Sequence, residues 1–281
     1  MSTRRAKRIG TIEPSSNSYR QKTVEDIISD GKRMTLTMFY YPRKTDIFIG
    51  NQQIYCAYAQ VYHTDDGIAR EMADLNKIRW DSECSYDEPF KQGEDTAMLF
   101  SLLITLIKDR FPTVKVVSFN DASSRKCDNN MGTMNLGVMK LFTDGKTWYE
   151  QHFKAYIDPN NKSAYENKMK ESNDTKRQMT WEEAKRNIEW NASGIAESEL
   201  KQKYEETTTW REWLRWIRTT LKDSAFCIWL TKNDWFDIFV RSVLRFDIMN
   251  YRFLVDTTHF NQQYTIKKIG GRREGTRKKR R

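Results

Sequence analysis

The sequence lacks any stretch of about 18 consecutive apolar residues, the minimum for a membrane-spanning helix. The basic residues near its N-terminus are not followed by the apolar segment that a secretory signal peptide requires. Its four cysteines are far apart and form no CxxC pair, so we expect neither a disulfide framework nor a zinc knuckle. Together these absences predict an intracellular protein in a reducing compartment, with no membrane segment.

The common catalytic signatures are missing as well. The chain has no Walker A lysine, no GxGxxG motif and no GxSxG motif. Its histidines, His63, His152 and His259, are too widely spaced for a zinc-binding helix of the HExxH type. Cys127 has no histidine near it in the sequence to activate a thiolate, so we expect a buried or loop cysteine and not a nucleophile.

What the sequence does contain is an uneven distribution of charge. The net charge is +10, but residues 4–8 hold four basic residues, and residues 267–281 hold nine basic residues and one acidic residue. Residues 9–266 therefore sum to about −2, which argues against a basic face on the folded body. Flexible cationic segments bind phosphates without reading bases. We expect nuclear import or non-sequence-specific contact with nucleic acid, centred on Arg277, Lys278, Lys279, Arg280 and Arg281.

The first half of the chain carries strand patterns followed by a buried helix. Residues 35–41 and 54–62 are rich in β-branched and aromatic residues, and residues 73–84 form a weaker strand candidate. Residues 96–110 are apolar on almost every side, which predicts a buried helix. Residues 114–119 predict a strand directly after that helix, an order that indicates an α/β layer.

Helices dominate the second half. Residues 134–142 predict one helix, and residues 158–180 have the polar composition of a linker. Three T-x-x-E capping boxes predict further helix starts, at Thr147, Thr180 and Thr209. After the last of these, Trp210, Trp213, Leu214, Ile217 and Leu221 recur at helical spacing. We expect this stripe to pack in a core, with base stacking as the alternative.

Three strings carry a resemblance to a known family: GEDTAMLFSLLITLIKDRFP, VSFNDASSRKC and GKTWYEQHFKAY. With the order of meander strands, loop, buried helix, strand, helix and aromatic-acidic signature, residues 34–155 resemble the GNAT superfamily of N-acetyltransferases. More narrowly, the strings look like a group of proteins encoded by large DNA viruses of eukaryotes, which combine a GNAT-like core with a helical C-terminal extension. GKTWYEQHF is the most specific of the three.

The resemblance implies a binding loop for acetyl-CoA before the buried helix. In the superfamily this loop presents backbone amides to the coenzyme's pyrophosphate, and its positions here are Gln92, Gly93, Thr96 and Ala97. Asp95 stands where the family has its first glycine. This departure brings a carboxylate against the pyrophosphate and offsets the positive end of the helix dipole.

The resemblance also implies catalytic residues for acetyl transfer. The family's late tyrosine-glutamate signature aligns with Tyr149, which makes this tyrosine the candidate acid that reprotonates the coenzyme A thiolate. The alternative for Tyr149 is a core aromatic in a capped helix. Glu83 is the candidate base for the amine, with Asp81 as second choice.

We therefore predict an α/β fold, with a GNAT-like mixed sheet and packed helices, plus a mainly helical, Trp-rich C-terminal extension. The predicted parts are a disordered basic arm (1–24), a GNAT-like domain (25–160), the extension (161–266) and a basic tail (267–281). One expected function is acetyl-CoA-dependent N-acetylation. The other is that of a catalytically inactive structural or virion-associated protein, located in the host nucleus or cytoplasm, whose tails contact nucleic acid or acidic partners.

Overall fold

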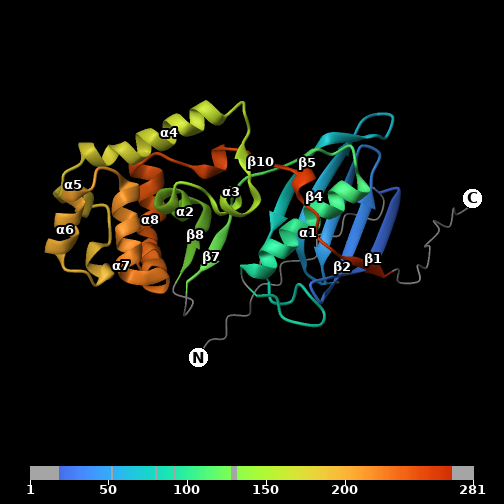
Figure 1. Cartoon of the computed structure of the whole chain (residues 1–281), viewed down its shortest axis with the longest axis horizontal. Helices are drawn as coiled ribbons and strands as arrows, with labels where there is room; N and C mark the ends of the chain where they lie inside the picture. Colours follow the sequence, from blue (N-terminus) through green and yellow to red (C-terminus); the bar gives the residue numbers. More distant parts are fainter. Residues whose placement is uncertain (1–18, 52, 80, 92, 128–131, 268–281) are drawn as a thin grey trace, which may run out of the picture. The chain divides into compact units, whose positions relative to one another are not determined.

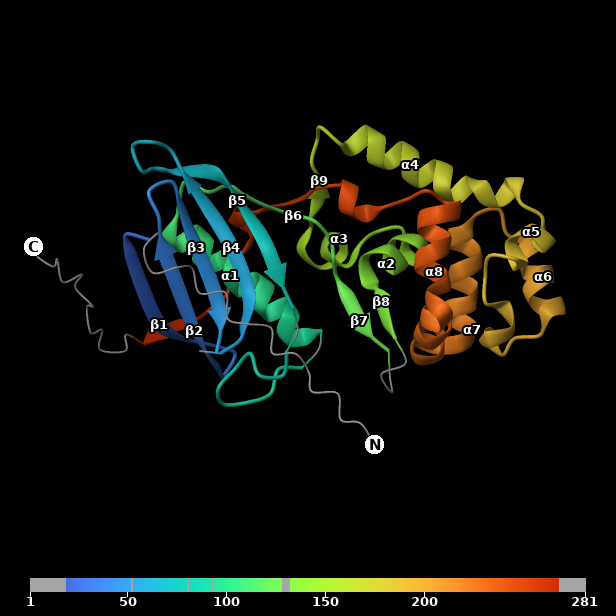
Figure 2. The same cartoon turned by 180° about the vertical axis from the view of Figure 1, so that it is seen from behind.

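The computed structural model of the chain describes residues 19–51, 53–79, 81–91, 93–127 and 132–267. It is an α/β fold with a large mixed sheet and several helices (Figures 1 and 2). The chain forms two compact units: the first spans residues up to Ser118 and from Asp256 onward, and the second is Phe119–Val255. The boundary that the sequence analysis placed at residue 160 falls inside the second unit, between β9 (Tyr156–Ile157) and α4 (Lys162–Asp174).

The first unit is built on an antiparallel meander in which each strand pairs with the next. Its strands are β1 (Gln21–Ser29), β2 (Lys32–Tyr40), β3 (Lys44–Gly50), β4 (Tyr55–His63) and β5 (Ala69–Ile78). Helix α1 (Glu94–Arg110) then leads to β6 (Val116–Phe119), which pairs with β5 in parallel. Strand β11 (Thr265–Lys267) pairs with the outer edge of β1, which gives the order β11-β1-β2-β3-β4-β5-β6. The predicted order of meander, buried helix and strand is confirmed.

Two strand assignments correct the sequence analysis at the ends of the body. Residues 21–24, which it placed in the N-terminal arm, belong to β1, where Gln21 lies opposite Tyr40. Lys267, which it placed in the tail, lies opposite Asp26 in the ladder of β1 and β11. Ladder hydrogen bonds hold these polar segments in strands although their composition carries no strand pattern.

Helix α1 covers one face of the meander, as the view of Figure 1 shows. Leu99, Leu103 and Ile107 are fully buried along the helix. The covered face of the sheet presents the row Met38, Ile47, Ala59 and Leu75, whose members lie opposite one another on neighbouring strands and are all buried. This apolar layer is the core of the first unit.

The second unit is mainly helical. It opens with the hairpin of β7 (Ser124–Lys126) and β8 (Thr133–Asn135) and includes the pair of β9 with β10 (Phe253–Asp256). Its helices are α2 (Leu136–Asp144), α3 (Trp148–Phe153), α4, α5 (Trp181–Lys185), α6 (Glu197–Glu206), α7 (Trp210–Thr231) and α8 (Trp235–Ile238). Shorter turns connect them: η2 (Thr175–Gln178), η3 (Trp190–Ser193), η4 (Lys232–Asp234), η5 (Phe239–Val243) and η6 (Ile248–Asn250), while η7 (Thr257–His259) belongs to the first unit.

The three predicted capping boxes are all present, at Thr147, Thr180 and Thr209. The predicted linker at 158–180 is wrong, since α4 occupies most of it. Tyr165 and Met169 lie four residues apart on α4 and are both buried, which anchors one side of an otherwise polar helix.

Indole side chains form the centre of the second unit. Trp210, Trp213 and Trp229 are at most 1% exposed, and the ring of Trp213 lies 5.8 Å from that of Trp210 and 6.2 Å from that of Trp229. Each indole N–H finds an acceptor, such as the carbonyl oxygen of Leu200 for Trp213, because an unpaired N–H would be costly in this apolar surrounding. The predicted core role of this stripe is confirmed.

Candidate functional site

The start of α1 is the position at which the sequence analysis placed a coenzyme site. Gly93 precedes the helix with φ of 94°, a backbone conformation that side chains other than glycine rarely adopt. Thr96 and Ala97 lie in the first turn and are partly exposed. Gln92 lies outside the described residues.

Asp95 occupies this helix start with its own carboxylate. The Asp95 carboxylate accepts a hydrogen bond from the backbone N–H of Lys91 and lies 3.4 Å from the ammonium of Lys32, a lysine that is 6% exposed. The backbone N–H groups of Asp95 and Ala97 donate to the carbonyl oxygens of Lys91 and Gly93. Three amides near the helix start are thus already bonded within the chain, and the helix dipole already faces a carboxylate.

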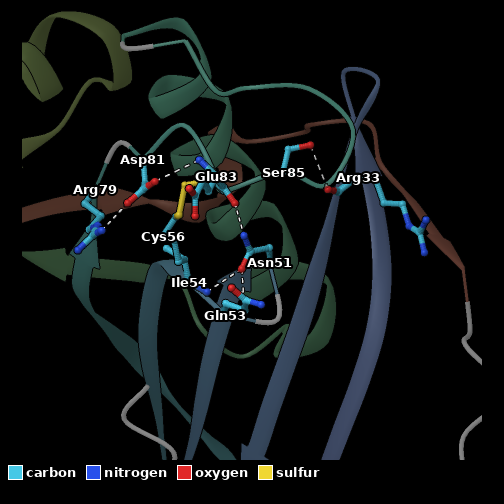
Figure 3. The surroundings of a disulfide bond; sticks show 10 residues. Arg33, Asn51, Gln53, Ile54, Cys56, Arg79, Asp81, Glu83 and Ser85 are labelled. Atoms are coloured by element: carbon cyan, nitrogen blue, oxygen red, sulfur yellow. Dashed lines mark hydrogen bonds and ion pairs between the residues drawn. A yellow bond between two sulfur atoms is a disulfide. The ribbon is translucent and has the colours of Figure 1, made fainter. Parts of the chain in front are cut away.

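Glu83 lies in the loop after β5, beside the disulfide drawn in Figure 3. Its backbone N–H donates to Asp81 Oδ1 over 3.1 Å, and its carbonyl oxygen accepts from the side-chain amide of Asn51. Its side chain is exposed and lines an open hollow of about 410 Å³ together with Asp87 and Glu88. The loop backbone is well anchored, but the hollow is acidic and repels a phosphate-bearing coenzyme.

Tyr149 belongs to the second unit, whereas Glu83 and the start of α1 belong to the first. It lies in α3 and is 7% exposed, with its ring 4.7 Å from that of Phe119. Burial, followed by the nearby Asp121 carboxylate, raises the pKa of Tyr149 above the ordinary tyrosine value. A phenol in this environment stays protonated at neutral pH.

The Asp121 carboxylate, which lies near Tyr149, belongs to a group of buried polar atoms that the sequence analysis did not identify. Asp121 is fully buried, and its Oδ2 atom has no hydrogen-bond partner among the described residues; the same holds for the Tyr165 hydroxyl and for Nε of Arg211. Burial raises the pKa of the Asp121 carboxyl. Burial also raises the pKa of Tyr165, with smaller contributions from Glu150 and Asp121. No short motif links these residues, which come from three separate segments.

Asp121 is held tightly from two sides. Its Oδ1 atom accepts hydrogen bonds from the backbone N–H and the hydroxyl of Ser123, at 3.0 and 2.5 Å. Its Oδ2 atom approaches Gly137 in the first turn of α2 so closely that an added Cβ there would lie 2.7 Å away. Gly137 is therefore required by this carboxylate and not by its backbone conformation.

All four cysteines form disulfides, which corrects the expectation of free thiols. Cys56 in β4 bonds to Cys84, 28 residues later, and Cys127 bonds to Cys227 in α7, 100 residues later. Wide spacing in the sequence is compatible with both bonds, because the fold brings the Cα atoms to 5.9 and 5.6 Å. The absence of a CxxC pair therefore did not exclude a disulfide framework. Cys127 is buried, as predicted, but it is not a thiol.

The remaining predicted site residues, Arg277, Lys278, Lys279, Arg280 and Arg281, lie outside the described residues. Within the described part of the chain, no group of three or more histidine, cysteine, aspartate or glutamate side chains has a metal-binding arrangement. No helix in that part is long and apolar enough to cross a membrane. Comparison of the chain with protein-family models, with curated proteins and with solved structures gave no match.

Proposed function

We propose that the chain is a binding protein without acetyltransferase activity, which holds a polyanion, such as nucleic acid, through its basic end segments. The observation that carries the proposal is the separation of charge. Residues 267–281 carry nine basic residues and one acidic residue, whereas residues 9–266 sum to about −2. Such a segment gains affinity by releasing counterions from phosphates, and this needs no fixed geometry.

The start of α1 supports the first half of the proposal. A coenzyme pyrophosphate needs free backbone N–H groups and a positive helix end. Here the backbone N–H of Lys91 already donates a hydrogen bond to the Asp95 carboxylate, which also pairs with the buried Lys32. Glu94 adds a second carboxylate to the first turn of the helix. The Lys32 charge is compensated by Asp95, so this helix end offers an anion little attraction.

The experiment is a salt series of binding to nucleic acid. Replacing Arg277, Lys278, Lys279, Arg280 and Arg281 by glutamine removes five charges and leaves β11 intact, since that strand ends at Lys267. We expect the slope of log K against log salt to fall by up to about 4, and binding at about 50 mM salt to weaken strongly. The melting temperature should stay unchanged, because the substitutions lie at least ten residues after the end of β11 at Lys267, the last strand among the described residues.

A matched control removes the same charge elsewhere. Lys154, Lys162, Lys170, Lys201 and Lys232 are exposed in the second unit, and their joint replacement by glutamine should leave the slope almost unchanged. If both variants bind as the parent chain does, the end segments are not the binding element. If both lose the same affinity, the chain responds only to its net charge.

Acetyl transfer remains a second candidate, because one observation favours the ancestry that the sequence suggested. The antiparallel pair β4 and β5, the buried α1 and the parallel pair β5 and β6 follow one another in the order of the GNAT core. Calorimetric titration with acetyl-CoA tests it. Micromolar binding that is lost in Gly93→Val would support this candidate, and absence of heat at millimolar coenzyme would reject it.

A further inference from the structure

The meander has a second face, opposite to the one that α1 covers. Strand pairing defines two rows on it, because residues directly opposite one another point to the same side. One row is Val24, Thr37, Phe48, Tyr58 and Lys77, and the next is Lys22, Phe39, Asp46, Gln60 and Asp74. We call these two rows the open face.

Aromatic rings form a continuous line across the open face. Phe48 stacks on Tyr58 at 4.5 Å with an interplanar angle of 3°, and it lies 5.8 Å from Phe39. Tyr55 approaches Phe48 at 4.8 Å. Phe39 and Phe48 are themselves buried among their neighbours, whereas Tyr58 keeps part of its surface exposed. Tyr55 and Tyr58 are therefore the rings of this line that offer surface to a partner.

The acidic and basic side chains of the open face differ in their exposure to solvent. Asp46 is 4% exposed and lies 3.1 Å from the Lys44 ammonium, and Asp74 accepts a hydrogen bond from Ser118. Lys22 and Lys77, by contrast, are exposed, and the Lys22 ammonium lies over the Phe39 ring at 5.2 Å. Asp46 is thus buried and bonded within the sheet, and Asp74 is partly exposed and bonded to Ser118. The exposed charges of the two rows are the ammonium groups of Lys22 and Lys77.

Among the described residues no helix covers the open face, which is the side of the meander turned toward the viewer in Figure 2. Single side chains reach its margins. The ring of Tyr19 lies 5.1 Å from that of Phe39, and the Tyr86 hydroxyl lies 2.8 Å from the Thr35 hydroxyl, with the Arg33 guanidinium over the Tyr86 ring at 5.6 Å. These margins add two aromatic rings, but the Arg33 guanidinium is paired with the Asp26 carboxylate at 2.6 Å, and Tyr86 lines the acidic hollow described above.

We propose that the open face binds single-stranded nucleic acid, with a base stacking on the partly exposed ring of Tyr58 and the backbone phosphates lying along the exposed Lys22 and Lys77. This deepens the proposed function and rests on it, since it names a folded surface for the polymer that the end segments attract. Stacking on aromatic rings tolerates any base and needs bases that are not paired. A duplex hides its base faces, so the open face distinguishes single strands from duplexes and the end segments do not.

The protonation state of Tyr58 suits this role. Burial among its neighbours, with a smaller contribution from the Asp46 carboxylate, raises the pKa of Tyr58 above the ordinary tyrosine value. The ring therefore stays neutral and does not repel phosphate. The Tyr58 hydroxyl lies 3.4 Å from Asp46 Oδ1, which directs the polar end of the side chain to the sheet's own carboxylate.

The experiment compares substitutions of one ring in the full chain. The probe is a fluorescent oligothymidylate of about 20 nucleotides, and a duplex of the same length serves for comparison, both at about 0.3 M salt to weaken the contribution of the end segments. Tyr58→Ala should weaken binding of the single strand at least about fivefold and leave duplex binding unchanged. Tyr58→Phe keeps the ring and should bind as the parent chain does. Tyr156→Ala removes a tyrosine of the second unit that is 41% exposed and should change neither affinity.

Photo-cross-linking provides a readout that does not depend on the folding of Tyr58→Ala. An oligonucleotide with 5-bromouracil, irradiated in complex with the unaltered chain, should attach to peptides that carry Tyr58. Cross-links confined to residues 1–18 and 268–281 would overturn the proposal. So would a folded Tyr58→Ala chain that binds the single strand as tightly as the parent.

The variant with the five terminal charges removed separates this proposal from the one it rests on. If the open face is correct, this variant still prefers the single strand to the duplex at about 0.3 M salt, and adding Tyr58→Ala abolishes the preference. If the open face is wrong and the proposed function is right, the terminal substitutions alone remove the salt dependence and Tyr58→Ala changes nothing. If the terminal substitutions leave the salt dependence intact, the proposed function fails whatever Tyr58 does.

Discussion

The two units use aromatic residues differently. In the second unit, indole rings gather at the centre, where Trp210, Trp213 and Trp229 are at most 1% exposed. In the first unit, the partly exposed Tyr58 stacks on the buried Phe48, on the face of the sheet that no described helix covers. The difference follows from periodicity: a helical stripe turns all its rings to one side, whereas a strand alternates between a covered and an uncovered face. Aromatic content alone therefore does not distinguish a core from a binding surface.

The largest expected difference between the units concerns their disulfides. The loop closed by Cys127 and Cys227 is the longer one, so removing that bond by Cys127→Ala and Cys227→Ala should lower the free energy of unfolding by about 4.7 kcal/mol in the chain-entropy model. Cys56→Ala with Cys84→Ala should cost about 3.6 kcal/mol. Tryptophan fluorescence measures the first effect, because eight of the nine tryptophans lie within Phe119–Val255.

Peptide-resolved hydrogen exchange in β3 and β4 measures the second effect. Each pair of substitutions should destabilise mainly its own unit. If loss of the shorter loop destabilised its unit more than loss of the longer loop did, chain entropy would not be the main source of stabilisation. Equal hydrogen-exchange protection in the parent chain and in both double variants would mean that the disulfides do not form.

The next effect concerns the aromatic residues themselves. Trp213→Ala removes a fully buried indole with four aromatic neighbours and should cost about 3–5 kcal/mol of unfolding free energy. Tyr58→Ala removes a partly exposed ring and should cost about 1–2 kcal/mol. Chemical denaturation of both variants checks the comparison. A cost for Tyr58→Ala as large as that for Trp213→Ala would make the open face a core.

A smaller effect is expected at Gly137 in α2. Alanine in a helix interior normally gains about 1 kcal/mol over glycine, but here its Cβ would lie 2.7 Å from the Asp121 carboxylate. We expect Gly137→Ala to destabilise the chain by about 1–3 kcal/mol, because the buried carboxylate is held by Ser123 and cannot move freely.

A double-mutant cycle tests the cause. In an Asp121→Ala background, Gly137→Ala should cost little or become stabilising, with a coupling of at least about 1 kcal/mol. Additive costs would show that another neighbour is responsible. Gly194→Ala is a poor control because its φ of 73° is itself unfavourable for alanine.

The smallest effect concerns two buried lysines, one in each unit. Lys32 has the carboxylate of Asp95 as a partner, whereas Lys176 donates to the carbonyl oxygens of Tyr204 and Thr207, at 2.5 and 2.6 Å. Burial lowers the pKa of Lys176 to about 8. Between pH 8 and the ordinary lysine value of 10.5, the unfolded chain therefore binds more protons than the folded one. The unfolding free energy should rise with pH across this window.

Urea denaturation at several pH values measures that slope, and Lys176→Met should reduce it. Lys32→Met provides the contrast, since it removes an ammonium that is paired with a carboxylate and should destabilise the chain across this pH window by leaving Asp95 unpaired. A slope that persists in Lys176→Met would assign it to another group.

Local signals in the sequence predicted much of this fold. The three capping boxes and the apolar run of α1 are each contained in a few consecutive residues, and all are present. Strand β1 was missed although a local signal for it exists: Asp30 and Gly31, both with positive φ, join it to β2 in a two-residue hairpin turn, and the sequence analysis did not use this Asp-Gly pair. The disulfide of Cys127 with Cys227 was missed for another reason, since only tertiary structure brings these residues together.

The candidate sites show the same limit. Tyr149 was found through a string of nine residues. The nearby Asp121, and Tyr165 and Arg211 in the same group of buried polar atoms, are scattered over 90 positions and share no motif. The open face was missed because the charge of residues 9–266 was summed as a whole. Only the strand register separates the buried Asp46 from the exposed Lys77.

The interrupted path of the first unit has a consequence for synthesis of the chain. On the ribosome, residues 119–255 emerge before the segment from Asp256 to β11 that completes the first unit. Domains usually fold in the order in which they are made, from the N-terminus onward. Here the first unit begins to emerge first but is completed last, because β11, which pairs with β1, is translated after the whole of the second unit. The nascent meander therefore exposes one strand edge for as long as the second unit takes to be translated.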